Sequence, residues 1–255
     1  MKLKRDSFAH QQRPEVVRTE VRIPCGAAWL YGDLALPVDF RSLVLFAHGS
    51  GSGRHSARNR QVAQVLQNAG IGTLLFDLLT AAEEQTDIHT GEHRFNIALL
   101  TQRMQDATLW ILAQDQFKDL PIGYFGASTG SAAALIAAAR LGERVAAVVS
   151  RGGRPDLAGP VVLSSLMAPT LLIVGGADHG VIELNEAAFQ RLRCEKQLAV
   201  VPQATHLFEE PGALEQVSAL AADWFKHHLH TGDQPQDRTA HGQTHSADRS
   251  KEARG

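Results

Sequence analysis

Short apolar runs alternate along this chain with stretches whose apolar residues recur at helical spacing. Residues 42–47 (SLVLFA) and 122–125 (IGYF) carry no charged side chain, as is typical of strands buried on both faces of a sheet. Residues 95–114 place apolar side chains three and four positions apart, which predicts an amphipathic helix. Strands that alternate with helices in this way predict an α/β fold with a mostly parallel central sheet and helices on both faces.

The first two predicted strands have a different pattern, because apolar and polar residues alternate on either side of Pro24-Cys25-Gly26. This predicts an antiparallel hairpin. No segment repeats another. The predicted strands are 20–23, 28–36, 42–47, 71–76, 122–125, 144–149, 170–174 and 198–201. The predicted helices are 57–68, 95–114, 131–140, 183–193 and 213–229, with a long polar loop at 78–92 and a short irregular or helical passage at 151–168.

Composition changes at both ends of the chain. Residues 1–16 are polar and are expected to form a flexible N-terminus, and residues 231–255 contain no large apolar side chain, which predicts a disordered polar tail. The segment between them, 17–230, is predicted to be a single α/β domain. Histidines in and just before the tail are interpreted as solvated side chains, with weak metal binding as the alternative.

Charge and cysteine content narrow the function classes. The 255 residues carry a net charge of −2, so the balance calls for neither a nucleic acid nor a membrane partner. The basic N-terminus is followed by no signal-peptide core, and no apolar run is long enough for a membrane span. Cys25 and Cys194 show no metal or redox spacing and fit a reducing compartment, so we expect a cytoplasmic protein.

The pentapeptide Gly126-Ala127-Ser128-Thr129-Gly130 lies between a predicted strand and an alanine-rich predicted helix. A G-x-S-x-G sequence in this context is typical of a sharp turn that exposes a serine hydroxyl at the edge of the sheet, over a helix N-terminus. Ser128 is therefore the candidate nucleophile. The alternative is a small residue that merely suits a tight turn.

A nucleophilic serine needs an acid and a base, and both should follow the carboxyl ends of later strands. Asp178 comes after strand 170–174 and a glycine turn, and is the candidate acid; the alternative is a cap for the next helix. Asp77 is a rival at another strand end, but it precedes the nucleophile and so breaks the Ser…Asp…His order. His206 follows the last predicted strand and is the candidate base, with a surface histidine as the alternative. His179 is a backup that lies too close to Asp178 along the chain.

The glycine-rich turn 48–53 (HGSGSG) follows strand 42–47 and is the second candidate source of oxyanion donors. The backbone N–H of Thr129, next after the nucleophile, should be one donor. The other should come from Ser50, with Gly51 as the alternative. His48 is expected to fix this loop by hydrogen bonds rather than to transfer protons.

These segments together resemble the α/β-hydrolase superfamily, and within it the dienelactone-hydrolase-like group, over roughly residues 17–229. The resemblance implies an α/β-hydrolase fold without a large cap domain, with Ser128 as nucleophile, Asp178 as acid and His206 as base. Dienelactone hydrolase itself uses a cysteine nucleophile, and this chain has serine, which favours a general esterase or thioesterase over activity on dienelactones. The segments that carry the resemblance are HGSGSG, GASTG, VVSRGGRPDL, LLIVGGAD and VPQATHLFEEPG.

The predicted function is hydrolysis of a small or medium carboxylic ester or thioester through an acyl-enzyme, with no cofactor and no metal. The partner is then a small-molecule substrate, and the sequence leaves the oligomeric state open. Two alternatives remain: a haloperoxidase or acyltransferase that uses the same triad, and a non-catalytic module of the same fold that binds a ligand or a partner.

Four arginines are candidates for recognition of a carboxylate or phosphate on the substrate. Arg151 and Arg154 follow a strand end, and Arg54 and Arg58 follow the glycine turn, where Gly51 would also face the substrate. The alternative is that these arginines are solvated or tie loops together. Loop 78–92 is the better candidate for a small flap, because passage 151–168 is too short for a lid domain. The acidic and histidine side chains of this loop have no recognisable metal-ligand spacing and are interpreted as solvated.

Overall fold

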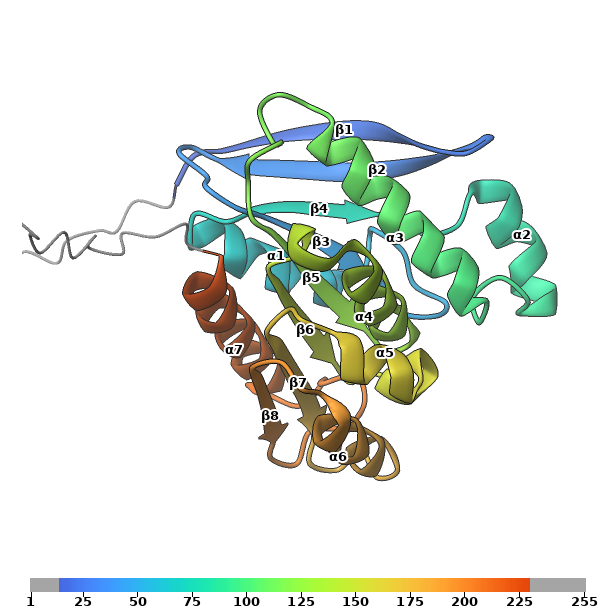
Figure 1. The fold of residues 1–255 in the computed structure, drawn as a ribbon, viewed down its shortest axis with the longest axis vertical. Helices are drawn as coiled ribbons and strands as arrows, with labels where there is room; N and C mark the ends of the chain where they lie inside the picture. The colour runs from blue at the N-terminus through green and yellow to red at the C-terminus, as the bar shows by residue number, and fades with distance from the viewer. Residues whose placement is uncertain (1–13, 230–255) are drawn as a thin grey trace, which may run out of the picture.

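Eight strands form one sheet in the computed structural model, which describes residues 14–229 (Figure 1). The strand order is β1-β2-β4-β3-β5-β6-β7-β8. The pairs β1–β2 and β2–β4 are antiparallel and every other neighbouring pair is parallel. The predicted mostly parallel α/β sheet is confirmed, as is the N-terminal hairpin.

The elements follow the predicted order. The strands are β1 (Val16–Cys25), β2 (Ala28–Pro37), β3 (Leu43–Ala47), β4 (Gly72–Phe76), β5 (Ile122–Ala127), β6 (Ala147–Arg151), β7 (Thr170–Gly175) and β8 (Lys196–Val201). The helices are α1 (Ala57–Asn68), α2 (Ala81–Thr90), α3 (Ile97–Leu112), α4 (Thr129–Leu141), α5 (Pro160–Ser165), α6 (Val181–Arg191) and α7 (Ala213–His228). Short 3₁₀ turns occupy Gly142–Arg144 and Pro155–Ala158.

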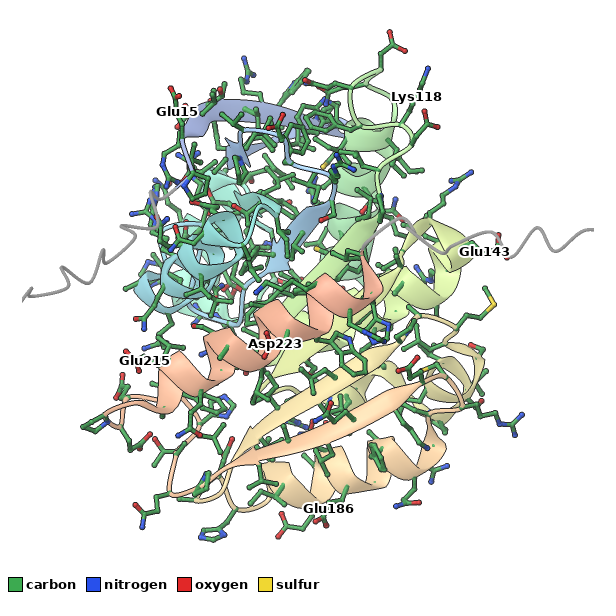
Figure 2. All side chains as sticks on the ribbon, turned by 90° about the vertical axis from the view of Figure 1, so that its left-hand side faces the viewer. Glu15, Lys118, Glu143, Glu186, Glu215 and Asp223 are labelled. Atoms are coloured by element: carbon green, nitrogen blue, oxygen red, sulfur yellow. The ribbon has the colours of Figure 1, made fainter. Side chains whose placement is uncertain are left out.

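The sheet is covered on both faces, because side chains of each central strand alternate between two apolar layers. In β3, Val44 and Phe46 pack into the layer formed with α1 and α7, and Leu43 and Leu45 pack into the layer formed with α3, α4 and α6. Figure 2 shows α7 crossing the first of these faces with Asp223 on its outer side. No described helix is long and apolar enough to cross a lipid bilayer.

Residues 81–90 form a helix, so the prediction of a polar loop over 78–92 is wrong. The side chain of Thr80 accepts a hydrogen bond from the N–H of Glu83, and the Glu83 carboxylate accepts one from the N–H of Thr80. This reciprocal capping box begins α2, and Gly91 in a left-handed conformation ends it. The capping pattern is present in the sequence. The helix has no clear apolar stripe, however, because most of its residues are exposed, and apolar spacing therefore does not predict it.

Smaller differences concern element ends. β6 begins at Ala147 rather than at residue 144, because the chain continues from α4 into the 3₁₀ turn Gly142–Arg144 before it enters the sheet. β1 begins at Val16, one position before the predicted domain start at residue 17. The predicted flexible residues 1–13 and the predicted tail 231–255 lie outside the described residues.

Helix α4 approaches the end of β3 so closely that only glycine fits at position 130. A Cβ on Gly130 would lie 2.3 Å from the carbonyl oxygen of His48 and 2.4 Å from that of Ala47. Both neighbours are backbone atoms of the buried strand end, which cannot move without disturbing the sheet. The second glycine of the pentapeptide therefore sets the distance between α4 and the turn after β3.

We predict that Gly130→Ala lowers the free energy of unfolding by about 3 kcal/mol or more, because the new methyl group forces a backbone shift. Gly123→Ala is the matched control. Its Cβ would lie 2.7 Å from Cε1 of Phe225, which is a side-chain atom rather than backbone. Urea unfolding should give a smaller loss for the control, and equal losses in the two variants would contradict this account.

Candidate active site

Ser128 lies between β5 and α4 in a conformation that is strained for a residue with a side chain. Its φ of 49° and ψ of −124° fall outside the regions that L-residues prefer. The turn requires glycine at position 126, because a Cβ there would lie only 2.5 Å from Cα of Ser131. The strand–serine–helix geometry is that of a nucleophile elbow.

Hydrogen bonds on both sides hold the strained serine in place. Its N–H donates to the carbonyl of Arg151 on the neighbouring strand (3.2 Å). Its own carbonyl accepts from the hydroxyl of Ser131 (2.7 Å) and from the N–H of Arg154 (3.2 Å). The surrounding loops therefore determine the conformation at Ser128, which is the condition under which such strain persists.

The structure brings the three predicted triad residues together. Nε2 of His206 lies 3.3 Å from Oγ of Ser128, and Nδ1 of His206 lies 2.8 Å from Oδ2 of Asp178. The Asp178 side chain is 10% exposed and that of His206 is 38% exposed. Asp178 follows β7 and His206 follows β8, as the sequence indicated. His179, the backup, is exposed.

The turn after β3 contacts the first residue of α4 directly. The N–H of Ser50 donates to Oγ1 of Thr129 (3.0 Å), so this predicted oxyanion donor already has a partner. Within the described chain no acceptor is found for the N–H of Thr129 or for that of Gly51. A Cβ on Gly49 would lie 3.0 Å from Cβ of Ser128, which shows how close the turn lies to the serine.

His48 fixes this turn, as predicted. Its Nε2 accepts from the N–H of Leu78 and its Nδ1–H donates to the carbonyl of Gly49, both at 3.0 Å. The ring is therefore neutral, with its proton on Nδ1. Burial lowers the pKa of His48 below its ordinary value of 6.5, against the opposing effects of the Gly49 hydrogen bond and of Asp77 and Glu84.

Arg54, one of the arginines considered for substrate binding, is engaged with carboxylates. It lies within 3.0 Å of Glu20, 3.5 Å of Asp33 and 3.3 Å of Asp77. The rival acid Asp77 is thus bound to Arg54 and accepts its backbone N–H as well (2.8 Å). This geometry supports the alternative that Arg54 ties loops together.

The other arginines also contact protein groups. Arg58 lies 3.2 Å from Glu209, and Arg154 makes two hydrogen bonds of 2.8 Å to Asp156, which raise its pKa. Arg151 is buried against the ring of Phe208, with Nε and Nη1 lacking a partner among the described residues. Burial, with a smaller effect of Arg58, lowers the pKa of Arg151 to about 10.

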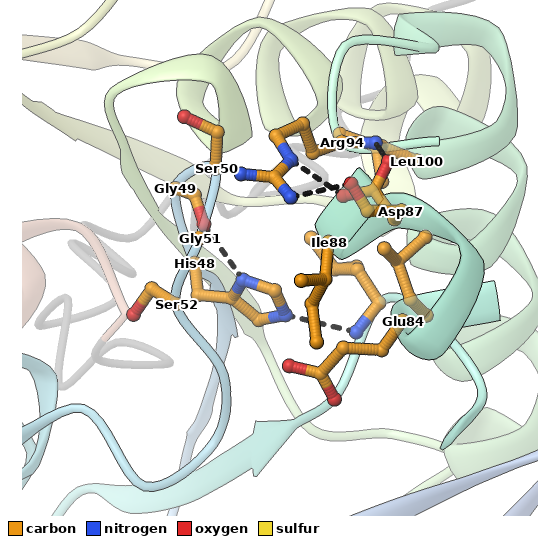
Figure 3. Close-up of a pocket in the computed structure, with 12 residues that line it drawn as sticks. His48, Gly49, Ser50, Gly51, Ser52, Glu84, Asp87, Ile88, Arg94 and Leu100 are labelled. Carbon is orange, nitrogen blue, oxygen red and sulfur yellow. Dashed lines mark hydrogen bonds and ion pairs between the residues drawn. The ribbon is translucent and has the colours of Figure 1, made fainter. Parts of the chain in front are cut away.

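A cavity of about 300 Å³ adjoins the turn after β3 (Figure 3). Gly51 lines it, whereas Arg54, Arg151 and Arg154 do not. Helix α2 forms one wall, and Arg94, which sequence reasoning did not single out, lines it beside Asp87. The sequence signal that could have found it is an arginine placed three residues after Gly91, the glycine that ends α2.

A possible ligand set for a metal lies elsewhere. Among the described residues, Glu195, His227 and His228 bring one ligand atom each within 4.8 Å of one another. Glu195 precedes β8 and the histidines end α7, so the group lies toward the amino end of β8, whereas Ser128 follows the carboxyl end of β5. The acidic and histidine residues considered in segment 78–92 form no such group.

Comparison with known proteins gives a consistent family. No protein-family model matches the chain. The crystal structure of dienelactone hydrolase from Anabaena variabilis is 53% identical, covers 86% of this chain and 100% of its own, and superimposes with a TM-score of 0.82. The chain belongs to the dienelactone hydrolase family of α/β-hydrolases. The predicted resemblance and the α/β-hydrolase fold are thereby confirmed.

More distant structures share this fold. Est1E from Butyrivibrio proteoclasticus has a TM-score of 0.70 at 16% identity. The match covers 82% of this chain and 98% of the Est1E chain. In Mycobacterium tuberculosis, a protein named "Putative phosphoribosyl transferase" is 55% identical over 216 residues, which are 85% of this chain and 48% of that protein. The chain thus spans about half the length of the curated relatives it matches.

We predict that acidification weakens the fold through His48. Because its folded pKa is depressed, the unfolded chain takes up this proton first, and the free energy of unfolding falls as the pH drops below about 6.5. Protonation would also remove the acceptor for Leu78. Replacement of His48 by Gln should flatten the stability–pH curve between pH 7.5 and 5.5, measured by urea unfolding. His179→Gln, at an exposed position, should leave the slope unchanged; a slope unaffected by His48→Gln would count against this role.

Proposed function

We propose that this protein is a serine hydrolase that cleaves a small or medium carboxylic ester, or a thioester, through an acyl-enzyme. One observation carries the proposal: His206 lies within reach of Ser128 on one side (3.3 Å) and of Asp178 on the other (2.8 Å), and Ser128 occupies a strained elbow. A nucleophile, a base and an orienting acid in this order are the requirements of acyl transfer. Membership of a hydrolase family agrees with it.

In the first step, Oγ of Ser128 attacks the acyl carbonyl while Nε2 of His206 takes the hydroxyl proton. The carbonyl oxygen becomes an oxyanion. Asp178 accepts the Nδ1–H of His206, which holds the ring in the required tautomer and stabilises the imidazolium. His206 then gives its proton to the leaving alcohol or thiol, and the acyl group stays on Ser128.

In the second step, His206 removes a proton from water as the water oxygen attacks the acyl-enzyme. The new oxyanion collapses, the acid leaves, and Ser128 regains its proton from His206. The chemistry requires no group beyond these side chains and two backbone donors.

The oxyanion is expected to bind the N–H of Thr129 and one N–H of the turn after β3. Thr129 begins α4, so its N–H points out of the helix N-terminus, where the helix dipole favours negative charge. Because Ser50 N–H donates to Thr129 Oγ1, it would share its hydrogen or release this bond when the oxyanion forms. The N–H of Gly51 is the alternative donor, as it was from sequence.

Alternative functions on the same site differ in what they require. An acyltransferase or a cofactor-free haloperoxidase would use the same three residues and would differ in the acceptor of the acyl group. A non-catalytic ligand-binding module would have no use for the strain at Ser128. The name of the mycobacterial relatives describes proteins of about twice this length, and a nucleophile–base–acid arrangement does not call for phosphoribosyl transfer.

Ser128→Ala should abolish hydrolysis of p-nitrophenyl acetate and butyrate and should also abolish labelling by a fluorophosphonate probe. Turnover and labelling are measured on wild type and variant at equal concentration, and circular dichroism shows whether the variant folds. Labelling without turnover in wild type would retain the site and indicate a narrower substrate. An unlabelled wild type, or activity that survives in the variant, would contradict the proposal of a serine hydrolase and favour the non-catalytic binding module.

Asp178→Asn should lower kcat by roughly 10⁴-fold while KM changes little, because an amide cannot hold the His206 tautomer that accepts the serine proton. Asp77→Asn is the matched control, since Asp77 also follows a strand end but binds Arg54. If the Asp77 variant lost activity and the Asp178 variant retained it, the assignment of the acid would be reversed.

A further inference from the structure

The end of α7 and the residue before β8 bring together three side chains of types that bind metals, and the proposed reaction uses none of them. We call Glu195, His227 and His228 the α7 cluster; each places one ligand atom within 4.8 Å of the others. Nε2 of His228 lies 3.7 Å from Oε1 of Glu195, and the rings of the two histidines are nearly perpendicular, with centroids 4.6 Å apart. Figure 1 shows α7 beside β8. The cluster lies toward the amino end of β8 and is therefore separate from the candidate active site.

Packing at the end of α7 fixes the ring of His228. Trp224 lies one helical turn earlier, and its ring centroid is 4.2 Å from that of His228. Trp224 is 9% exposed and the side chain of His228 is 8% exposed, so both rings are held against the body of the protein. Nε2 of His228 is thereby kept on the side of Glu195.

The buried Nε2 of His228 has no hydrogen-bond partner among the described residues. Its 3.7 Å distance to Glu195 is too long for a hydrogen bond. A buried polar atom without a partner costs free energy, which a group bound at this nitrogen would recover. Burial lowers the pKa of His228 below its ordinary value of 6.5, although Glu195 opposes this shift. A neutral ring with its proton on Nδ1 offers a lone pair at Nε2, as a metal ligand does.

The charges around the α7 cluster favour a cation. Glu195 supplies a carboxylate, and the cluster lies at the carboxyl end of α7, where the helix dipole is negative. The ammonium of Lys196 donates to the carbonyls of Phe189 (2.7 Å) and Leu192 (2.6 Å) and is therefore directed toward the end of α6. Lys226, which precedes the histidines, opposes a cation but is exposed, so that solvent screens its charge.

We propose that Glu195, His227 and His228 bind Zn²⁺, with water in a fourth position. Two imidazoles and a carboxylate are ligands that zinc takes in proteins, and three protein ligands leave one position open. Zinc–ligand bonds of about 2.0–2.1 Å place the ligand atoms about 3.4 Å apart. The side chains of Glu195 and His227 are exposed and can move to close the remaining gap. This inference goes beyond the hydrolase function and does not depend on it.

A zinc ion in the α7 cluster ties the last described helix to the last strand. β8 pairs with β7 alone in the described sheet, and it leads into the loop that carries His206. An ion that binds the folded chain stabilises it by the free energy of binding. The site therefore acts as a staple at the start of an edge strand.

Calorimetric titration with ZnCl₂ tests the site. The full-length chain, without an affinity tag and freed of metal by EDTA and dialysis, should bind one Zn²⁺ at the α7 cluster. His228→Gln and Glu195→Gln should each weaken this binding by about tenfold or more, because each removes a ligand. Glu195 is exposed, so its variant gives a result even if the His228 variant does not fold. Unchanged affinity in either variant, or no binding by wild type, overturns the proposal.

Two control variants distinguish the α7 cluster from other histidines. His241→Gln/His245→Gln removes two histidines from residues 231–255, and His206→Gln removes the histidine of the candidate active site. Both variants should bind Zn²⁺ as wild type does. Loss of binding in either control would place the ion on those histidines and would contradict the assignment.

Thermal unfolding gives a second measurement. Excess Zn²⁺ should raise the unfolding midpoint of wild type by about 5 °C or more, because the ion binds the folded chain. EDTA should reverse this shift, and Glu195→Gln should show none. An equal shift in wild type and in Glu195→Gln would mean that the ion binds elsewhere, which also overturns the proposal.

Discussion

The close approach of three backbone segments around Ser128 is the constraint on which the rest of the site depends. Gly126 allows the end of β5 to touch α4, and Gly130 allows α4 to touch the end of β3. The turn after β3 is thereby brought against Ser128, with the N–H of Ser50 donating to Oγ1 of Thr129. Larger residues at these two glycines would separate the serine from the groups that could bind its oxyanion.

The order of elements could be predicted from sequence because the central strands are buried on both faces and read as uninterrupted apolar runs. The positions of Ser128, Asp178 and His206 followed from the rule that loops at the carboxyl ends of parallel strands converge. Their distances follow from strand order, since β5 and β7 flank β6 and β8 adjoins β7. Sequence alone could not give this order, although it gave the list of strands.

The roles of the arginines were harder to predict, because the partner of a long charged side chain depends on tertiary contacts. Arg54 follows the glycine turn, yet the carboxylates that it contacts come from the N-terminal hairpin and from the residue after β4. Helix α2 was missed for a related reason. Its start is fixed by the local capping box of Thr80 and Glu83, which leaves no apolar periodicity in the sequence. Because α2 was not predicted, Arg94, which follows it and lines the cavity, was not considered either.

Helix α2 also has a consequence for how such a site can diversify. Its capping box and the Asp87–Arg94 contacts are formed within one short stretch of chain, and among the described contacts Arg103 on α3 is the ion-pair partner of Glu83. Substitutions on the exposed side of this stretch leave the sheet, the turn at Ser128 and the loop that carries His206 untouched. Residues of this cavity wall can therefore be exchanged while the contacts among Ser128, His206 and Asp178 are kept.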